Sequence, residues 1–206
     1  APISSEAPGG VLRAAGIGQT GISGSGAFIE PLSGSLGAGI IEDHYPPRGG
    51  VDVPRNTKII VTFKEPIFLD SLLLPGTYDP EAPLVTGDLN ADNVKIYRTA
   101  DTITGALVSA AVDVAVTGDL KTFVFDPVAL IGSSLEPQNY SVFLSPAILK
   151  LLPDLSTTAP AFPPPYADGY VWSFQVSTVV DITPAQVQSF IPSPATEYAR
   201  NILVQV

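Results

Sequence analysis

From residue 44 onward, apolar and polar residues alternate in a series of short stretches. These stretches are rich in β-branched and aromatic residues, and turn-forming Gly, Pro, Asp and Ser residues separate them. Period-two alternation predicts half-buried strands, because successive side chains of a strand point to opposite faces of its sheet. Several short strands separated by turns are typical of an antiparallel β-sandwich, so the sequence predicts an all-β fold. The alternating stretches are 59–63, 94–97, 112–117, 122–125, 140–144 and 172–176.

Helical signals are weak in comparison. Residues 147–152 favour a single helical turn, and residues 184–190 favour another, for which Thr183 is a suitable N-cap. The chain contains 18 Gly and 21 Pro residues, which disfavours long helices.

The first 43 residues have a different composition from the rest. Ten of the 18 glycines lie between Gly9 and Gly39, and isolated apolar residues stand between them. Such a segment makes a poor core, because glycine loses much entropy on ordering and has no side chain to pack. Two interpretations stay open, a flexible leader and an extended arm that becomes ordered against a neighbouring subunit. In the second interpretation the contacts come from Val11, Leu12, Ile17 and Ile22.

A segment near the start of the alternating region returns, shortened, as residues 191–206. After the Arg-Asn pair that both copies share, residues 59–63 align with residues 202–206. A repeat of this kind indicates modules in series, here one complete unit and the opening strand of a second. The complete unit closes with the strand predicted at 170–177, so Ile202, Val204 and Val206 have no place in its sheet. Either a second unit follows, or this strand inserts into a neighbouring subunit.

Four stretches of the alternating region resemble a known family. Residues 50–67 read GVDVPRNTKIIVTFKEPI and resemble the opening of bacterial immunoglobulin-like (Ig-like) domains of the S-layer protein type. The later stretches LNADNVKIY (89–97), TFVFDP with LEPQNYSV (122–127 and 135–142) and YVWSFQVS (170–177) resemble the middle and closing strands of that family. The resemblance implies an Ig-like sandwich over 44–179. Residues 68–88 and 153–168 depart from the family pattern as a longer insert and a Pro-rich excursion, and we expect both to be loops. It also implies a scaffold used in cell-surface arrays, adhesins, fibres and secreted multi-domain enzymes, with no catalytic residues.

Composition narrows the choice of partners. The formal net charge is −10, which disfavours nucleic acid because acidic surfaces repel phosphate. The 10 Lys and Arg residues are scattered, which argues against a patch that binds anionic membranes. The sequence also lacks an apolar run of about 18 residues, so it predicts no membrane span. Cysteine is absent, which excludes disulfides and thiol catalysis. The chain starts at Ala1, which fits either a fragment or a mature protein after removal of a signal peptide, and we expect an extracellular or cell-surface location.

Two features of the sequence look like catalytic motifs, but a structural interpretation fits each of them better. Residues 16–21 match the dinucleotide pattern GxGxxG, but the Gly- and Ser-rich residues that follow cannot open the helix that this motif needs. His44 is the single histidine, and we expect it on the surface or in a turn. General acid–base candidates are solitary or scattered, so we expect no enzymatic activity.

Two binding sites are weighed against the scaffold interpretation. Asp88, Asn90 and Asp92 have the spacing of the start of a calcium loop, and Asp119 is a further candidate ligand, although the glycine and glutamate that an EF-hand requires are missing. The simpler interpretation is a polar turn before the strand at 94–97. Several aromatic residues could form a glycan-binding face, although alternation with Phe174 places Trp172 in the core. These residues are Tyr45, Tyr78, Tyr166, Tyr170 and Trp172.

Taken together, the patterns predict three parts: a Gly-rich arm (1–43), an Ig-like sandwich (44–179), and a linker with the first strand of a second domain or a donor strand (180–206). The function expected from them is that of a non-catalytic structural subunit of a fibre, S-layer or adhesin that polymerises with itself. The alternative is an accessory or carbohydrate-binding module of a larger secreted protein. We expect no cofactor, with calcium as the one candidate ion.

Overall fold

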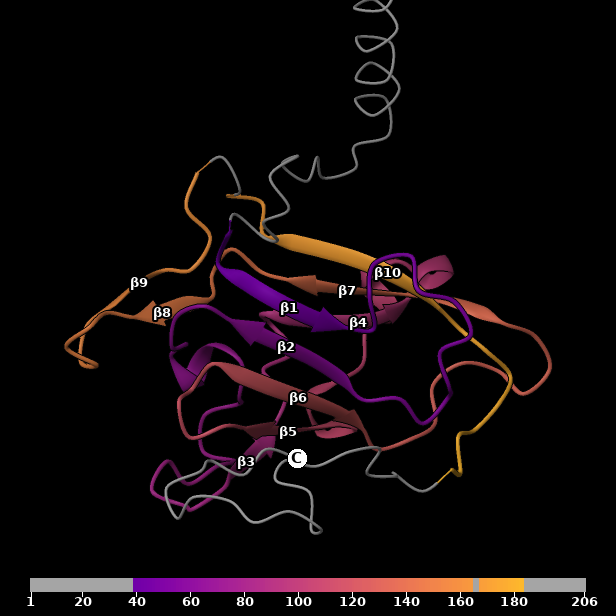
Figure 1. Cartoon of the computed structure of the whole chain (residues 1–206), viewed down its shortest axis with the longest axis horizontal. Helices are drawn as coiled ribbons and strands as arrows, with labels where there is room; N and C mark the ends of the chain where they lie inside the picture. The colour runs from indigo at the N-terminus through magenta and orange to yellow at the C-terminus, as the bar shows by residue number, and fades with distance from the viewer. Residues whose placement is uncertain (1–38, 165–166, 184–206) are drawn as a thin grey trace, which may run out of the picture.

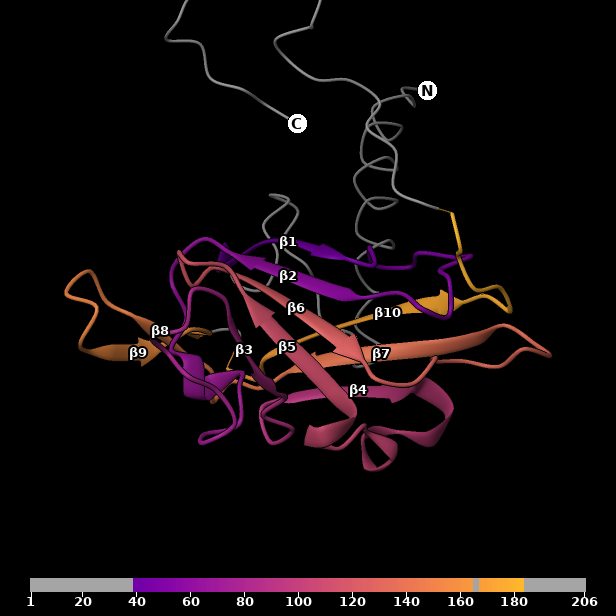
Figure 2. The same ribbon diagram turned by 90° about the horizontal axis from the view of Figure 1, so that it is seen from below.

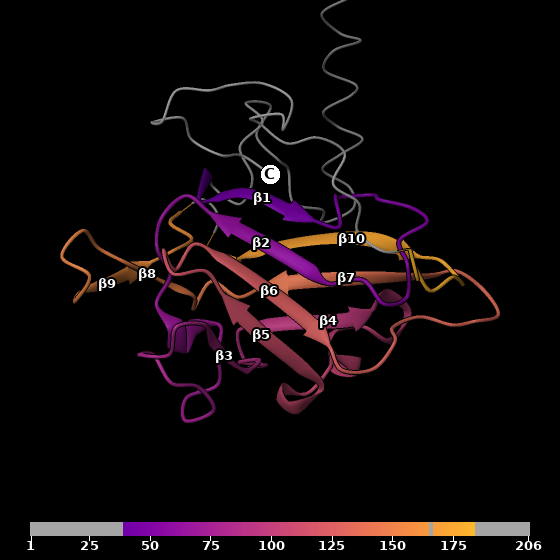
Figure 3. The ribbon, with the colours of Figure 1, turned by 60° about the horizontal axis from the view of Figure 1, so that its bottom comes forward.

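The computed structural model describes residues 39–164 and 167–183, and in these residues two antiparallel sheets pack as a β-sandwich (Figure 1). The five-stranded sheet has the order β1-β2-β6-β5-β3, as Figure 3 shows, and the three-stranded sheet has the order β10-β7-β4. The predicted all-β sandwich is therefore confirmed. The five-stranded sheet contains β1 (Ile41–Tyr45), β2 (Ile59–Phe63), β3 (Val85–Asp88), β5 (Val112–Val116) and β6 (Thr122–Pro127). The other sheet contains β4 (Val94–Arg98), β7 (Gln138–Leu144) and β10 (Tyr170–Val176).

Short elements connect and flank the two sheets. A separate antiparallel hairpin is formed by β8 (Leu149–Leu151) and β9 (Thr158–Pro160). The helical elements among the described residues are single 3-10 turns: η2 (Leu69–Ser71), η3 (Thr99–Asp101), η4 (Ile103–Gly105) and η5 (Ser109–Ala111). None of the described helices is long and apolar enough to cross a membrane.

The alternation in the sequence matches the burial of the strands. In β2 and β10, every second residue is buried between the sheets. The largest of these side chains meet at the centre, where the rings of Phe63 and Phe123 pack edge to face at 5.9 Å. Trp172 is 1% exposed, so its predicted place in the core is confirmed. Burying side chains of this size stabilises the fold by about 1.5–3 kcal/mol each.

Three local predictions were wrong. Residues 147–152 contain β8 instead of a helical turn, because the backbone at Ile67 and Phe68 pairs with this stretch. The predicted loop at 68–88 contains η2 and β3, and the predicted loop at 153–168 contains β9. The core also reaches further toward the N-terminus than the alternation indicated, since Ile40 and Ile41 are buried.

The segment between β1 and β2 crosses from one sheet to the other. Its residues 49–53 run beside β10, where Gly49 donates its backbone N–H to Ser173 and Val53 donates to Gln175, at 2.7 and 3.1 Å. The bridge between Val53 and Val176 is parallel. This crossover segment (46–58) therefore pairs with the outer edge of β10 and closes one side of the sandwich.

The described chain enters and leaves the sandwich at opposite poles, as Figures 1 and 2 show. At one pole, which we call the hairpin pole, β1 begins next to the end of β2, and the β8–β9 hairpin projects. At the other, the crossover pole, β2 begins and residues 177–183 follow the end of β10. The crossover segment and the segment after β10 are joined there, because the side chain of Asn56 forms two hydrogen bonds with the backbone of Asp181, at 2.7 and 2.9 Å.

Candidate functional site

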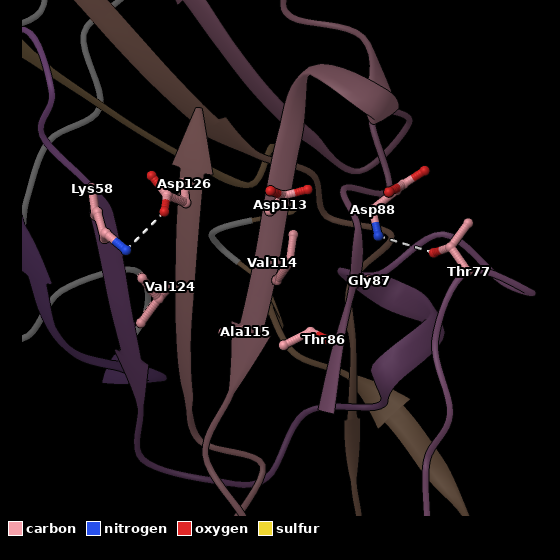
Figure 4. A pocket seen from close by; sticks show the side chains of 10 residues that line it. All are labelled: Lys58, Thr77, Thr86, Gly87, Asp88, Asp113, Val114, Ala115, Val124 and Asp126. Atoms are coloured by element: carbon pink, nitrogen blue, oxygen red, sulfur yellow. Dashed lines mark hydrogen bonds and ion pairs between the residues drawn. The ribbon is translucent and has the colours of Figure 1, made fainter. Parts of the chain in front are cut away.

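A groove of about 480 Å³ lies on the outer face of the five-stranded sheet (Figure 4). It forms where β2, β6, β5 and β3 lie side by side, and most of the outward side chains there are polar or small. Asp126 is paired in register with Asp113, which is paired in register with Asp88. The groove is lined by Lys58, Thr77, Thr86, Gly87, Asp88, Asp113, Val114, Ala115, Val124 and Asp126.

The groove has an acidic character. Lys58 Nζ lies 2.7 Å from Asp126 Oδ2, and both side chains are well exposed, so this ion pair contributes about 0–1 kcal/mol. Three carboxylates and one ammonium group therefore share one row across the sheet. Carboxylates directly opposite each other on neighbouring strands repel, so this row weakens the sheet instead of stabilising it. The groove offers carboxylate oxygens as hydrogen-bond acceptors to hydroxyl groups.

One wall of the groove is fixed by the loop before β3. Thr77 accepts a hydrogen bond from the backbone N–H of Asp88 at 3.0 Å and donates its hydroxyl to the carbonyl of Leu74 at 2.8 Å. Tyr78, the next residue, donates its hydroxyl to Asp70 Oδ1 at 2.5 Å. Burial raises the pKa of Tyr78 to about 12, and the hydrogen bond to Asp70 adds to the effect.

The structure separates the predicted calcium ligands. Asp88 lies at one end of the β3–β5 ladder, whereas Asp119 follows the opposite end of β5. Asn90 Oδ1 accepts the backbone N–H of Asp92 at 3.1 Å, and Asn90 Nδ2 donates to the carbonyl of Asp70 at 2.7 Å. Asn90 and Asp92 therefore form the polar turn that was the simpler interpretation.

Asp119 has local partners of its own. Its carboxylate accepts the hydroxyl of Thr117 at 2.6 Å and the backbone N–H of Lys121 at 3.2 Å, and these bonds lower the pKa of Asp119. Within residues 39–164 and 167–183, no three acidic or histidine side chains converge as a metal centre requires.

His44 is buried, contrary to the prediction of a surface or turn position. Its side chain in β1 is 7% exposed because its polar atoms find partners inside the sandwich. Nδ1 lies 2.9 Å from the carbonyl oxygen of Pro46, and Nε2 lies 3.0 Å from the hydroxyl of Tyr170. The ring also stacks on Trp172, with centroids 4.3 Å apart. His44 thus connects the two sheets, and Asp43 contacts its backbone N–H instead of its ring.

Two of the rings weighed above for a glycan-binding face are buried. Tyr170 and Trp172 are 3% and 1% exposed, so neither ring can stack on a sugar from solvent, which agrees with the core position predicted for Trp172 and excludes Tyr170 from such a face. Tyr45 is exposed but lies on β1, and Tyr166 lies outside the described residues. Among the described residues, therefore, Tyr170 and Trp172 add no ring to an exposed aromatic face.

The predicted assembly residues cannot be placed. Val11, Leu12, Ile17 and Ile22 in the arm, and Ile202, Val204 and Val206 in the tail, lie outside the described residues. The outer-face groove was missed by the sequence analysis. Its one available signal was the acidic residue at an outward strand position, such as Asp113 between Val112 and Val114.

Comparisons with known proteins found similar solved structures but no match among family models or curated proteins. One similar solved structure is that of surface layer protein SbsC, domains 1–6, with a TM-score of 0.39 and 12% identity. The match covers 68% of this chain and 14% of that one, so the chain spans only a small part of SbsC. Another is CopC from Methylosinus trichosporium OB3b, with a TM-score of 0.35, 10% identity, and coverage of 67% of this chain and 92% of CopC.

Proposed function

We propose that this chain is a non-catalytic structural subunit of an extracellular or cell-surface assembly, joined to its neighbours by strand pairing. One observation supports the proposal above others. Residues 191–206 repeat a segment that, in the described sandwich, forms the crossover segment and β2. The sandwich already contains one of each, so the second copy belongs to another unit.

The position of β2 explains what its repeat requires. β2 has neighbours on both sides, β1 and β6, and the side chains of Ile59, Val61 and Phe63 are fully buried. The matching residues of the tail are Ile202, Val204 and Val206. Burying each of them would yield about 1.5–3 kcal/mol. Ordering five backbones costs about 1–2 kcal/mol per residue, so the strand needs the hydrogen bonds of a partner sheet as well.

The sandwich offers its own tail little free edge. The outer edge of β10 pairs with the crossover segment. The outer edge of β3 pairs with residues 72–74, and that of β4 accepts a bond from Leu107 to Ile96 at 2.8 Å. Three of the four sheet edges therefore carry local pairing in every copy, so among the described residues the edge of β1 is the one that remains for a tail strand.

The test compares the mass of the full chain in solution with that of altered chains, by size-exclusion chromatography with light scattering. We expect the 21.5 kDa chain to form multimers and a chain lacking residues 190–206 to be monomeric. The triple variant I202S/V204S/V206S should also be monomeric. Leu203→Ser with Gln205→Ser, on the opposite face of the strand, is the matched control and should still assemble. A full chain that stays monomeric up to millimolar concentration would refute the proposal.

A second function, a binding module, is favoured by the outer-face groove. Asp113, Asp88 and Thr86 there present acceptors and a hydroxyl group, the chemistry that holds a hydroxylated ligand such as a glycan. Calorimetric titration with soluble oligosaccharides, on the wild type and on Asp113→Ala, tests it. Binding that disappears in the variant would support this function over the structural one.

A further inference from the structure

Large apolar side chains are exposed at the crossover pole. The described residues contain eleven exposed large hydrophobic side chains, and those that stand at this pole or directly beside it include five from three separate segments: Val51 (64% exposed), Val128 (67%), Leu130 (49%), Val179 (61%) and Ile182 (88%). Single exposed apolar residues are ordinary, but a group of them at one end of a domain usually marks a contact surface.

Backbone bonds hold these connections next to one another. Arg55 donates its backbone N–H to the carbonyl of Val179 at 2.8 Å, and the carbonyl of Arg55 accepts the N–H of Ile131 at 3.0 Å. Arg55 Nε also donates to the carbonyl of Ile131 at 3.2 Å. The apolar residues are therefore presented on a braced surface instead of on independent loops.

We infer that the crossover pole docks the hairpin pole of a second copy of this chain, head to tail. The inference rests on the proposed function. The described chain leaves at the crossover pole through Thr183, and the repeat of the crossover segment and β2 starts only eight residues later, at Ile191. The repeat thus starts within eight residues, along the sequence, of the pole that carries the exposed apolar residues. At the opposite pole Leu84 and Leu155 are 62% and 63% exposed and supply apolar surface for the contact.

The reach of the tail agrees with this arrangement. The eighteen residues between Thr183 and Ile202 span up to about 60 Å when extended. A strand of five to seven residues is only about 17–24 Å long, so the tail strand can reach past the pole into a stacked neighbour. A head-to-tail contact leaves one free pole on each copy, so it propagates into an open filament instead of closing as a dimer.

The test uses sedimentation velocity of the full chain over a wide range of concentration. Ile182→Asp with Val179→Asp should weaken self-association at least tenfold and leave the melting temperature unchanged, since both side chains are exposed. Lys95→Asp, which changes a charge on the outward face of β4, is the control and should associate as the wild type. Leu84→Asp with Leu155→Asp should weaken association as strongly as the first pair. An equimolar mixture of the two double variants should form heterodimers and no larger species, because one intact contact remains.

Each outcome has one meaning. If the Val179 and Ile182 variant assembles as the wild type while the chain without residues 190–206 does not, the docking surface is refuted and the proposed function stands. If the Leu84 and Leu155 variant associates as strongly as the wild type, the two copies meet pole to identical pole and the head-to-tail contact is refuted. If hydrogen exchange of the Val179 and Ile182 variant differs from that of the wild type only in the dilute monomer, the surface is covered by the tail of its own chain instead of by a second copy. If the wild-type chain never associates, both ideas fail.

Discussion

Trp172 and Pro46 are joined across the side of the sandwich: the indole Nε1 of Trp172 donates a hydrogen bond to the carbonyl oxygen of Pro46 at 3.0 Å. The same oxygen lies 2.9 Å from Nδ1 of His44. The bond therefore ties β10 of one sheet to the point where the chain leaves β1 of the other. The single tryptophan thus holds the start of the crossover segment against β10.

Replacing Trp172 by Phe tests this bond directly. The change keeps an aromatic ring in the core but removes the only donor from the indole, so the buried carbonyl of Pro46 loses a partner. We expect a loss of about 1–3 kcal/mol in the free energy of unfolding, measured by urea denaturation followed by circular dichroism. Tyr45→Phe, at a side chain that is 44% exposed, is the control and should change stability by less than about 0.5 kcal/mol. Equal stability of the two variants would contradict the assigned role.

Gly169, just before β10, is predicted to tolerate no side chain. Its φ is +83°, and a Cβ atom there would lie 2.2 Å from the carbonyl oxygen of Leu144. Gly169→Ala should therefore destabilise the protein by more than about 3 kcal/mol, since backbone has to move. Gly49→Ala, with φ of +69° and no atom within 4 Å of the new Cβ, separates the two causes and should cost only about 1–2 kcal/mol. Thermal melts of both variants decide; similar melting temperatures would show that the close approach to Leu144 does not matter.

Asp154 governs the acid behaviour of the β8–β9 hairpin. Hydrogen bonds from the backbone N–H groups of Thr157 and Ser156, and from the hydroxyl of Thr157, lower the pKa of Asp154 to about 2. Because this pKa lies below the ordinary value of 3.8, the contribution of the ionised carboxylate is complete above pH 3.8 and is lost as the pH falls toward 2. Carbon-detected NMR titration should give a midpoint near 2 for Asp154. Asp154→Asn should remove the pH dependence of hairpin order in this window, and a midpoint near 3.8 would contradict the hydrogen-bonded geometry.

Tyr78 should titrate far outside the normal range. Its pKa of about 12 lies above the ordinary 10.0, so its contribution to stability is complete below pH 10 and is lost as the pH rises toward 12. Ultraviolet difference titration of the seven tyrosines should resolve one late step. Asp70→Asn should move that step to lower pH without restoring 10, because burial, the larger cause, remains. A late step that does not respond to this substitution belongs to another tyrosine.

The central strands were predictable, and the first strand was not. β2, β5, β6 and β10 alternate strictly, because every second side chain faces the other sheet. β1 does not, since an irregularity at Asp43 makes Ile41 and His44 the buried residues, three positions apart. The polarity of the histidine side chain gave no reason to expect it in the core, because a buried polar side chain needs hydrogen-bond partners. Those partners, Pro46 and Tyr170, are brought to it only by the tertiary fold.

The groove and the poles depend on features that no local pattern contains. The row of Asp88, Asp113 and Asp126 exists only because β3, β5 and β6 pair in one register. β3 is far in sequence from β5, the strand with which it pairs. The pairing of the crossover segment with β10 was hidden for a similar reason, since Gly49 and Pro54 interrupt the alternation there. Sequence therefore predicts which residues are buried better than it predicts which strands become neighbours.

Hydrogen exchange of the full chain, measured by mass spectrometry at low and at high protein concentration, tests the central claim most directly. If strand pairing between neighbours builds the assembly, the backbone amides of residues 202–206 should exchange freely in the dilute chain and become protected by at least a hundredfold when multimers form. Amides of β2, which has both neighbours within its own sandwich, should be protected equally at both concentrations. Free exchange of residues 202–206 in the multimer, or equal protection in the monomer, would contradict the account.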